Sequence, residues 1–167
     1  MRHSAGILFY IRDSKTKDMR FLLGKDSKYD CWSDFGGKCE DDDTDSIQTA
    51  AREFYEETSG VFMSKYHAVA MIKNSSRLLK CTSYRNRKYC MYLVEIFDMI
   101  KLLSSISKFN SFVHYVAKLE PDDYYYRYKE KKKIGLFDLK YIKENPIEFR
   151  SVFHNSVLTN LLHLEGA

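Results

Sequence analysis

The stretch that most constrains this chain runs from the glycine pair Gly36-Gly37 to a third glycine, Gly60. Between them, Asp45 is a favoured helix N-cap, and Gln48 three residues later completes a capping box. Apolar and small residues then recur at helical spacing, namely Ile47, Ala50, Ala51, Phe54 and Thr58. We therefore expect a tight glycine loop, a charged linker, and a helix over residues 45–59 that ends near Gly60.

Glutamates crowd one side of this expected helix. Glu53, Glu56 and Glu57 stand at positions i, i+3 and i+4, where helical neighbours have Cβ atoms about 5–6 Å apart. Carboxylates that close repel one another unless a positive charge lies among them. Mg²⁺ and Mn²⁺ are the natural candidates, because both prefer carboxylate oxygen and water as ligands. The pattern predicts a divalent cation site on the helix.

Length and composition bound the class of protein. A chain of 167 residues predicts a single domain over residues 1–167, and its net charge of +4 is consistent with an anionic ligand. No apolar run approaches the roughly 18 residues that span a bilayer, and residues 1–5 lack the apolar core of a signal peptide. We therefore expect a cytoplasmic protein with no membrane partner. The cysteines form no Cys-x-x-Cys pair and are expected to be reduced thiols: Cys31, Cys39, Cys81 and Cys90.

Outside the central stretch, the pattern predicts strands, a helix, strands and a helix, which is typical of helices packed on a mixed sheet. Residues 4–10 and 19–23 resemble a hairpin, and residues 31–35 a short strand. Residues 100–114 are ambiguous between a helix and an extended segment. The other expected elements are strands at 67–73, 87–97 and 133–139, a basic turn region at 74–86, and a closing helix over 149–162 with Pro146 in its first turn.

With these residues in view, the central stretch resembles the signature of the Nudix hydrolases. Gly37 matches the opening glycine, the run from Arg52 to Glu57 matches the Arg-Glu and Glu-Glu centre, and Gly60-Val61 matches the close. The resemblance implies an α/β fold, a Nudix-like α/β/α sandwich in which the Nudix helix and a C-terminal helix flank a mixed β-sheet.

Two departures from the family pattern concern spacing. The interval from Gly37 to Arg52 is one residue longer than the pattern, and Asp45 places that residue in the loop over 41–44, so the helix keeps its register. Counting forward from Gly37, the first glutamate of the pattern becomes Asp43, whose role stays open. The other extra residue is Ser59, which follows the glutamates and leaves the metal face intact.

The resemblance also implies an activity and roles for particular residues. Family members cleave a pyrophosphate linked to another moiety by attack of water on phosphorus, with Mg²⁺ or Mn²⁺ as cofactor. The expected metal ligands are Glu53, Glu56, Glu57 and the backbone of Gly37. The expected catalytic residues are Glu56 or Glu57 as base, Arg52 and the later acid Glu130, with which Glu120, Asp122 and Asp123 compete. The expected phosphate-binding cations are Lys38, Arg77, Arg85 and Lys88.

Three functions remain open from the sequence. The leading one is a metal-dependent pyrophosphohydrolase that acts on a nucleoside diphosphate derivative. A second keeps the chemistry with capped RNA or an inositol pyrophosphate as substrate, because residues 77–88 and 127–133 are basic and tyrosines 124–128 can stack on a base. The third is a catalytically silent module that binds nucleotide or RNA. The third predicts damaged metal ligands, whereas all three glutamates are present.

Overall fold

The structure, a computed structural model, describes residues 3–83, 87–119 and 130–161. The side chains of residues 80–83, 87 and 119 are also outside the description. In chain order, the elements are β1 (Ser4–Arg12), β2 (Met19–Asp26), β3 (Trp32–Ser33), β4 (Phe35–Lys38), α1 (Ser46–Glu57), α2 (Lys65–Ser75), β5 (Ser76–Ser83), β6 (Arg87–Glu95), α3 (Met99–Leu119), β7 (Lys131–Asp138), α5 (Leu139–Glu144), a 3₁₀ turn (Pro146–Glu148) and α6 (Ser151–Leu161).

Strand β1 is the centre of a mixed sheet. It runs parallel to β6 on one edge, and its other edge is shared by two antiparallel partners, β4 beside its first half and β2 beside its second half. Strand β5 pairs with β6, while β3 and β7 pair with β2. This sharing places the glycine pair of β4 against the start of β1, with Gly37 opposite Ala5.

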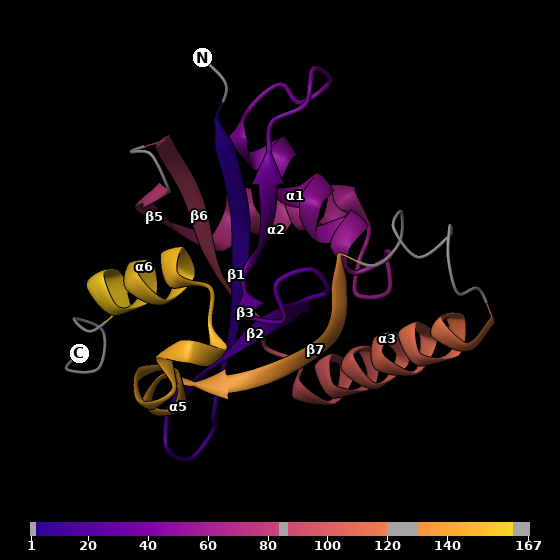
Figure 1. Cartoon of the computed structure of the whole chain (residues 1–167). Helices are drawn as coiled ribbons and strands as arrows, with labels where there is room; N and C mark the ends of the chain where they lie inside the picture. Colours follow the sequence, from indigo (N-terminus) through magenta and orange to yellow (C-terminus); the bar gives the residue numbers. More distant parts are fainter. Residues whose placement is uncertain (1–2, 84–86, 120–129, 162–167) are drawn as a thin grey trace.

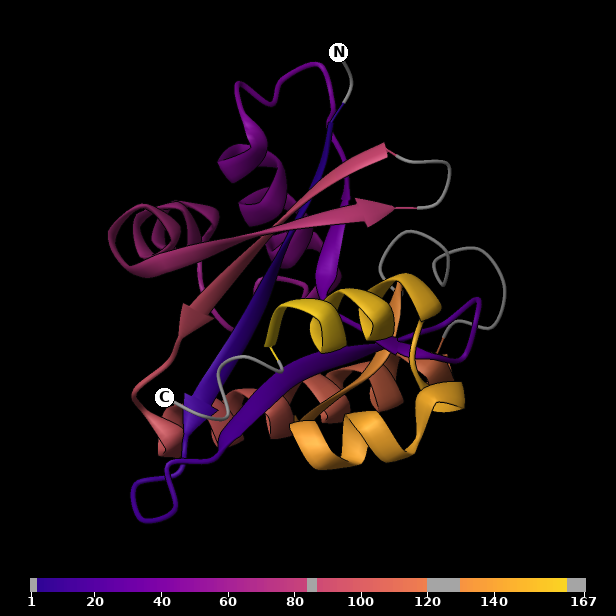
Figure 2. The ribbon, with the colours of Figure 1, turned by 90° about the vertical axis from the view of Figure 1, so that its left-hand side faces the viewer.

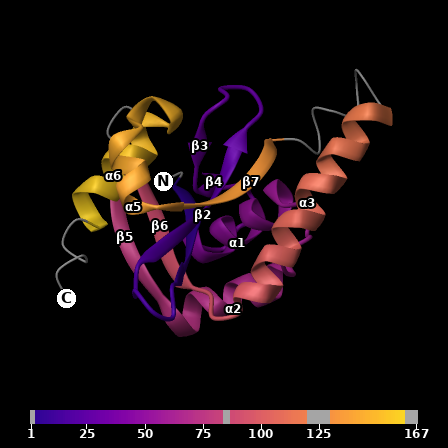
Figure 3. The same ribbon diagram turned by 90° about the horizontal axis from the view of Figure 1, so that it is seen from below.

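Helices cover both faces of the sheet (Figures 1 and 3). Helices α1, α2 and α3 cover one face, and α5 and α6 cover the other, where Figure 2 shows them in front of the strands. Each face has its own buried apolar cluster, one built around Phe54 and the other around Phe153. The α/β/α sandwich predicted from the sequence is confirmed.

The residues of β1 explain why it lies at the centre. Ile7, Phe9 and Ile11 belong to the cluster under α1, while Leu8 belongs to the cluster under α6. Successive side chains of a strand point to opposite faces, so a strand covered on both sides is apolar at nearly every position. The predicted hairpin with β2 is confirmed, with Phe9 opposite Leu22.

Phe54 fixes α1 on the sheet. Its side chain is fully buried, and its ring packs at 4.8 Å between centroids on Phe9, 5.0 Å on Phe35 and 5.9 Å on Phe62. These contacts are edge-on, the geometry that aromatic pairs favour. They anchor the middle of the helix, so the polar side chains on either side of Phe54 have fixed positions.

The ends of α1 agree with the sequence in register. Asp45 is the N-cap, and its carboxylate accepts a hydrogen bond of 2.9 Å from the N–H of Gln48. At the C-terminal end, Ser59 donates to the Glu56 carbonyl and Gly60 to the Tyr55 carbonyl, a Schellman pattern. Ser59, rather than glycine, takes the left-handed position after the cap, with φ of 50°.

One expectation for the middle of the chain, the strand at 67–73, is wrong. Residues 67–73 belong to α2, because the hydroxyl of Ser64 caps the helix by accepting from the His67 N–H, and the buried residues Ala68 and Ile72 are four apart. A strand would have buried alternate residues. Within the region 74–86, where the sequence predicts a turn, residues 76–83 form β5, which pairs antiparallel with β6; residues 84–86, between the two strands, lie outside the described residues, so the expected turn stays a prediction.

The ambiguous segment 100–114 lies within one helix, α3, which Asp98 caps by accepting from the Lys101 N–H. The expected closing helix is present but shorter, as α6. Pro146 begins a separate 3₁₀ turn, and α5 precedes it directly after β7. Among the described helices, none has the length and apolar character needed to cross a membrane.

Candidate active site

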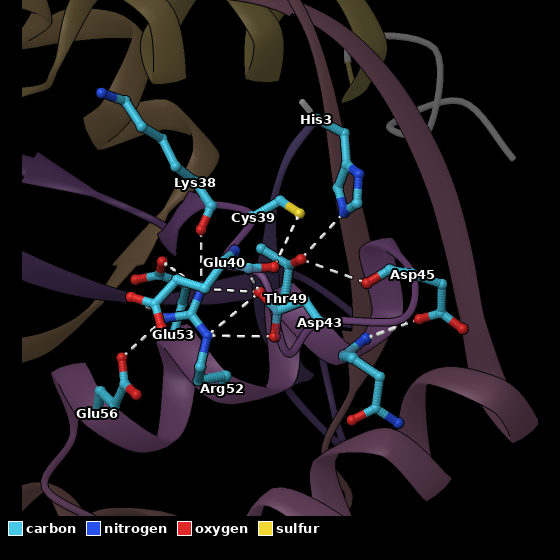
Figure 4. Close-up of polar contacts among 11 residues, drawn as sticks. His3, Lys38, Cys39, Glu40, Asp43, Asp45, Thr49, Arg52, Glu53 and Glu56 are labelled. Carbon is cyan, nitrogen blue, oxygen red and sulfur yellow. Dashed lines mark hydrogen bonds and ion pairs between the residues drawn. The ribbon is translucent and has the colours of Figure 1, made fainter. Parts of the chain in front are cut away.

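Arg52 is the centre of the polar cluster on α1 (Figure 4). Its Nε lies 3.2 Å from Asp43 Oδ1, and its Nη2 donates to Asp43 Oδ2 at 3.0 Å and to the Lys38 carbonyl at 2.8 Å. The Arg52 side chain is only 10% exposed. Its planar fork therefore ties the loop after β4 to the helix through two separate points.

Asp43 has a defined role in this arrangement. Its side chain is 1% exposed and also accepts a hydrogen bond from the Glu40 N–H at 3.0 Å. Burial alone would raise the pKa of Asp43, but hydrogen bonds from Arg52 and the Glu40 N–H outweigh it and lower the pKa to about 2. The short acid in the loop is thus the ionised anchor of Arg52.

The same guanidinium holds two of the glutamates. Nη2 of Arg52 donates to Glu53 Oε1 at 3.1 Å, and Nη1 donates to Glu56 Oε2 at 2.9 Å, the predicted i,i+4 pair. Glu53 is 12% exposed and Glu56 is 54% exposed. Burial raises the pKa of Glu53 to about 7; Arg52 opposes that rise, and the charges of Glu130 and Glu56 add to it.

Gly37 lies directly against the carboxylate of Glu53. A Cβ at position 37 would lie 2.5 Å from Glu53 Cδ, far inside van der Waals contact. Only glycine lets the backbone of β4 approach the glutamate this closely. The Glu53 carboxylate therefore lies directly against the main chain of β4 at Gly37.

Glu57 is held differently from the other two glutamates. Its side chain is 4% exposed, with Oε1 3.2 Å from Lys131 Nζ and Oε2 accepting from the Gly36 N–H at 2.9 Å. Burial raises the pKa of Glu57 to about 8, against the effect of Lys131. Lys131 itself is 2% exposed and donates to Ser33 Oγ at 2.9 Å.

A second buried contact, between β6 and the turn before β4, supports the glycine pair Gly36-Gly37. The hydroxyl of Tyr89 donates to Asp34 Oδ2 at 2.5 Å, and burial raises the pKa of Asp34. A Cβ on Gly36 would lie 2.5 Å from the Cα of Gly6 and closer still to the Tyr89 hydroxyl. Gly6 and Gly36 thus make room for the tyrosine, which links β6 to the turn between β3 and β4.

The donors at this site fit a hard divalent cation. Arg52 donates to Glu53 Oε1 and to Glu56 Oε2. The other carboxylate oxygen of each glutamate accepts no hydrogen bond from the described residues. One or two carboxylates, completed by water and substrate phosphate, are the usual protein ligands of Mg²⁺. Within the described ranges, no three His, Cys, Asp or Glu side chains are arranged to hold a metal ion.

Two other predicted residues border this cluster. Glu130 is exposed and directly precedes β7, and its charge raises the pKa of both Glu53 and Glu57. Lys38 is exposed at the end of β4. In Figure 4 its side chain extends away from the glutamates, while its carbonyl accepts from Arg52.

The predicted cations of the β5–β6 hairpin do not come together. Arg77 is opposite Leu93 and Lys88 is opposite Thr82, so they lie near opposite ends of the ladder, about 17 Å apart along the strands. Several other predicted residues lie outside the described part of the chain: Arg85, Glu120, Asp122, Asp123 and tyrosines 124–128.

The sequence alone did not identify the buried partners. Asp43 could have been assigned, because its spacing from Gly37 matches the glutamate of the family pattern. Lys131 carried no signal, since it is the first of three consecutive lysines. For Ser33 and Tyr89, the sequence likewise predicts only that they lie in strands.

Comparison with known proteins locates the fold. No protein-family model matches the chain, and no curated protein matches it. Solved structures do match, among them an Ap4A hydrolase from C. elegans, with TM-score 0.54 and 14% identity over 97% of each chain. A bifunctional NMN adenylyltransferase/ADP ribose pyrophosphatase from Francisella tularensis, complexed with AMP and Mn, gives TM-score 0.55 and 18% identity over 96% of this chain and 40% of that one. A MERS1–RNA complex from T. brucei gives 0.52 and 9% identity over 88% and 55%.

The chain has the Nudix hydrolase fold. On the Nudix fold, the predicted box is the segment that forms β4, the following loop and α1. In this segment Arg52 pairs with Asp43 of the loop, and α1 keeps the register predicted from its N-cap Asp45. Ser59, the other departure from the family pattern, lies in the left-handed turn after α1.

Proposed function

We propose that this protein is a divalent-metal-dependent hydrolase that cleaves a phosphoric anhydride in a nucleoside diphosphate linked to another moiety. The observation that carries the proposal is the pair Glu53 and Glu56, each held at one oxygen by Arg52 and open at the other, on a helix anchored in the core. Rigid helices position ligands better than loops. An Ap4A hydrolase and an ADP ribose pyrophosphatase are among the proteins of similar structure, and both names describe this reaction class.

Glu53 and Glu56 would hold Mg²⁺ or Mn²⁺ through their open oxygens, with the backbone of Gly37 beside them. The chemistry that such a cation supplies is neutralisation of phosphate charge and a lower pKa for bound water. Arg52 is a positioning residue in this proposal, because its buried guanidinium contacts the two glutamates and not the surface. Lys38 is the proposed phosphate-binding cation; it is exposed at the end of β4, and its side chain must turn toward the glutamates to reach a phosphate bound there.

We assign the general base to Glu130. It is exposed, it is close enough to Glu53 and Glu57 for its charge to raise their pKa values, and no ion pair of its side chain is found among the described residues. A base must remain free to take a proton from water, and positioned bases contribute about 10²–10⁴-fold to rate. Glu57 meets this condition less well, because both of its oxygens already have partners.

The test is hydrolysis of a substrate panel with Mg²⁺ or Mn²⁺: nucleotide sugars, ADP-ribose, dinucleoside polyphosphates, capped RNA and inositol pyrophosphates. We expect turnover of a nucleotide derivative, lost in Glu56→Gln. Glu130→Gln should lower kcat by about 10²-fold or more and leave metal affinity unchanged. Binding of a nucleotide without hydrolysis, with wild type and Glu56→Gln alike, would contradict the proposal.

Capped RNA stays in the panel because one protein of similar structure is seen in an RNA complex. The described basic residues give it less support, since Arg77 and Lys88 do not form one surface. RNA turnover with a steep dependence on salt would change the assigned substrate and leave the reaction class intact.

A further inference from the structure

Lys131 is a cation built into the acidic cluster. Its Nζ lies 3.2 Å from Glu57 Oε1 and donates to Ser33 Oγ at 2.9 Å, and its side chain is 2% exposed. A lysine is almost never buried this deeply unless it is paired. The position of the ammonium is therefore set by the structure and not by solvent.

The neighbouring strand leaves space for this side chain. A Cβ on Gly24 of β2 would lie 2.8 Å from both Cγ and Cδ of Lys131. The aliphatic stem thus fills the place of the missing side chain, and it fixes the direction in which the ammonium leaves β7. Gly24 and Ser33 lie on paired strands, opposite each other, so one edge of the sheet supplies both walls of the slot.

The ammonium competes with a metal ion for Glu57. A Mg²⁺ ion binds carboxylate oxygen at about 2.0–2.1 Å, so an ion on Glu57 Oε1 would lie within about 5 Å of Nζ. The other oxygen of Glu57 already accepts from the Gly36 N–H at 2.9 Å. Glu53 and Glu56 differ, since each keeps one oxygen without a hydrogen bond from the described residues.

We propose that Lys131 takes the place of a second divalent cation, so that the cluster binds one metal ion through Glu53 and Glu56. Glu57 is then a positioning residue that joins Lys131 to the N–H of Gly36 and holds the glycine loop in place. This inference rests on the proposed metal site and adds to it the number of ions and the residue that sets that number.

The experiment is titration of the full chain with Mn²⁺, followed by the paramagnetic resonance signal of the free ion. We expect one Mn²⁺ per wild-type chain and two per Lys131→Met chain, because methionine keeps the apolar stem and removes the charge. Lys132→Met is the matched control: Lys132 is the next residue, pairs with Asp30 at the surface, and should leave the number at one.

A second comparison applies even if Lys131→Met fails to fold. Glu57→Gln should still bind one Mn²⁺, whereas Glu53→Gln should bind none at a concentration that saturates wild type. Two ions on wild type, one ion on folded Lys131→Met, or loss of binding in Glu57→Gln would each overturn the inference. Absence of hydrolysis with one bound ion would instead contradict only the proposed function.

Discussion

The pair of Asp43 and Arg52 predicts how much stability one loop residue contributes. The pKa of Asp43 is lowered from 3.8 to about 2 in the folded chain, and each pKa unit corresponds to about 1.36 kcal/mol. Its side chain is 1% exposed, so screening by solvent is small. Asp43→Asn should therefore lower the free energy of unfolding by about 2–3 kcal/mol at pH 7. For a chain of this length, that is roughly 5–10 °C in Tm.

The direction of the pKa shift decides how the stability contribution of Asp43 depends on pH. A carboxylate whose pKa is lowered by folding stabilises the protein at every pH above its unfolded value, and the contribution disappears as pH falls through its folded value. The difference between wild type and Asp43→Asn should thus be constant above about pH 4 and shrink toward pH 2. Urea denaturation of both proteins at pH 7, 5, 4 and 3 measures this difference.

Asp42→Asn is the matched control for this series. Asp42 is exposed in the same loop, and its substitution changes net charge by the same amount. We expect its effect to stay within about 0.5 kcal/mol, as for most surface changes. Equal losses in the two variants, or a loss in Asp43→Asn that does not change with pH, would refute the assignment of Asp43 as the anchor of Arg52.

Three further predictions concern the ends of the same helix and its acids. Gly37→Ala should reduce metal-dependent turnover by at least about tenfold, because its Cβ would displace the Glu53 carboxylate; Mg²⁺ dependence of kcat measures this. Ser59→Gly should raise the free energy of unfolding by about 1–2 kcal/mol, since it relieves a left-handed φ of 50° and removes a buried hydroxyl that has no hydrogen-bond partner among the described residues; thermal denaturation measures it, and an unchanged Tm would count against the strain. Without metal, the unfolding free energy should fall as pH rises from about 4.5 to 7, because the Glu53 pKa of about 7 makes the folded state hold the proton longer; Mg²⁺ should flatten the slope in urea titrations.

The sequence predicted the parts of this fold that depend on local signals. The N-cap Asp45 and the repeat of apolar residues behind it fixed the register of α1, and the structure has the same cap. The hairpin of β1 and β2 followed from apolar runs on either side of a polar turn. Each signal lies within a few residues of the element it defines, so no tertiary information was needed.

Residues 67–73 show where local signals fail. The segment reads His-Ala-Val-Ala-Met-Ile-Lys, which is apolar at nearly every position and so has no clear period. The cap at Ser64 and the place of α2 against α1 decide the matter in favour of a helix. Because α2 ends at Ser75, the residues from Ser76 onward are available to form β5, which is an edge strand beside β6.

The contact between Glu57 and Lys131 depends on an irregularity in β7 that regular side-chain alternation does not predict. In β7, Ile134 and Leu136 belong to the core under α1, so regular alternation would turn Lys132 toward α1 and Lys131 away from it. The pairing of β2 with β7 shifts register between Lys25 and Asp26, and one extra residue of β7 is accommodated there. A bulge reverses the direction of the side chains that lie beyond it. The shift therefore brings Lys131 to Glu57 and leaves Lys132 to pair with Asp30 at the surface. If Lys132 is the extra residue of the bulge, removing it should leave Lys131 two residues before Ile134 and still on the α1 side, so the Glu57–Lys131 pair and the number of bound metal ions should be kept while the surface pair with Asp30 is lost.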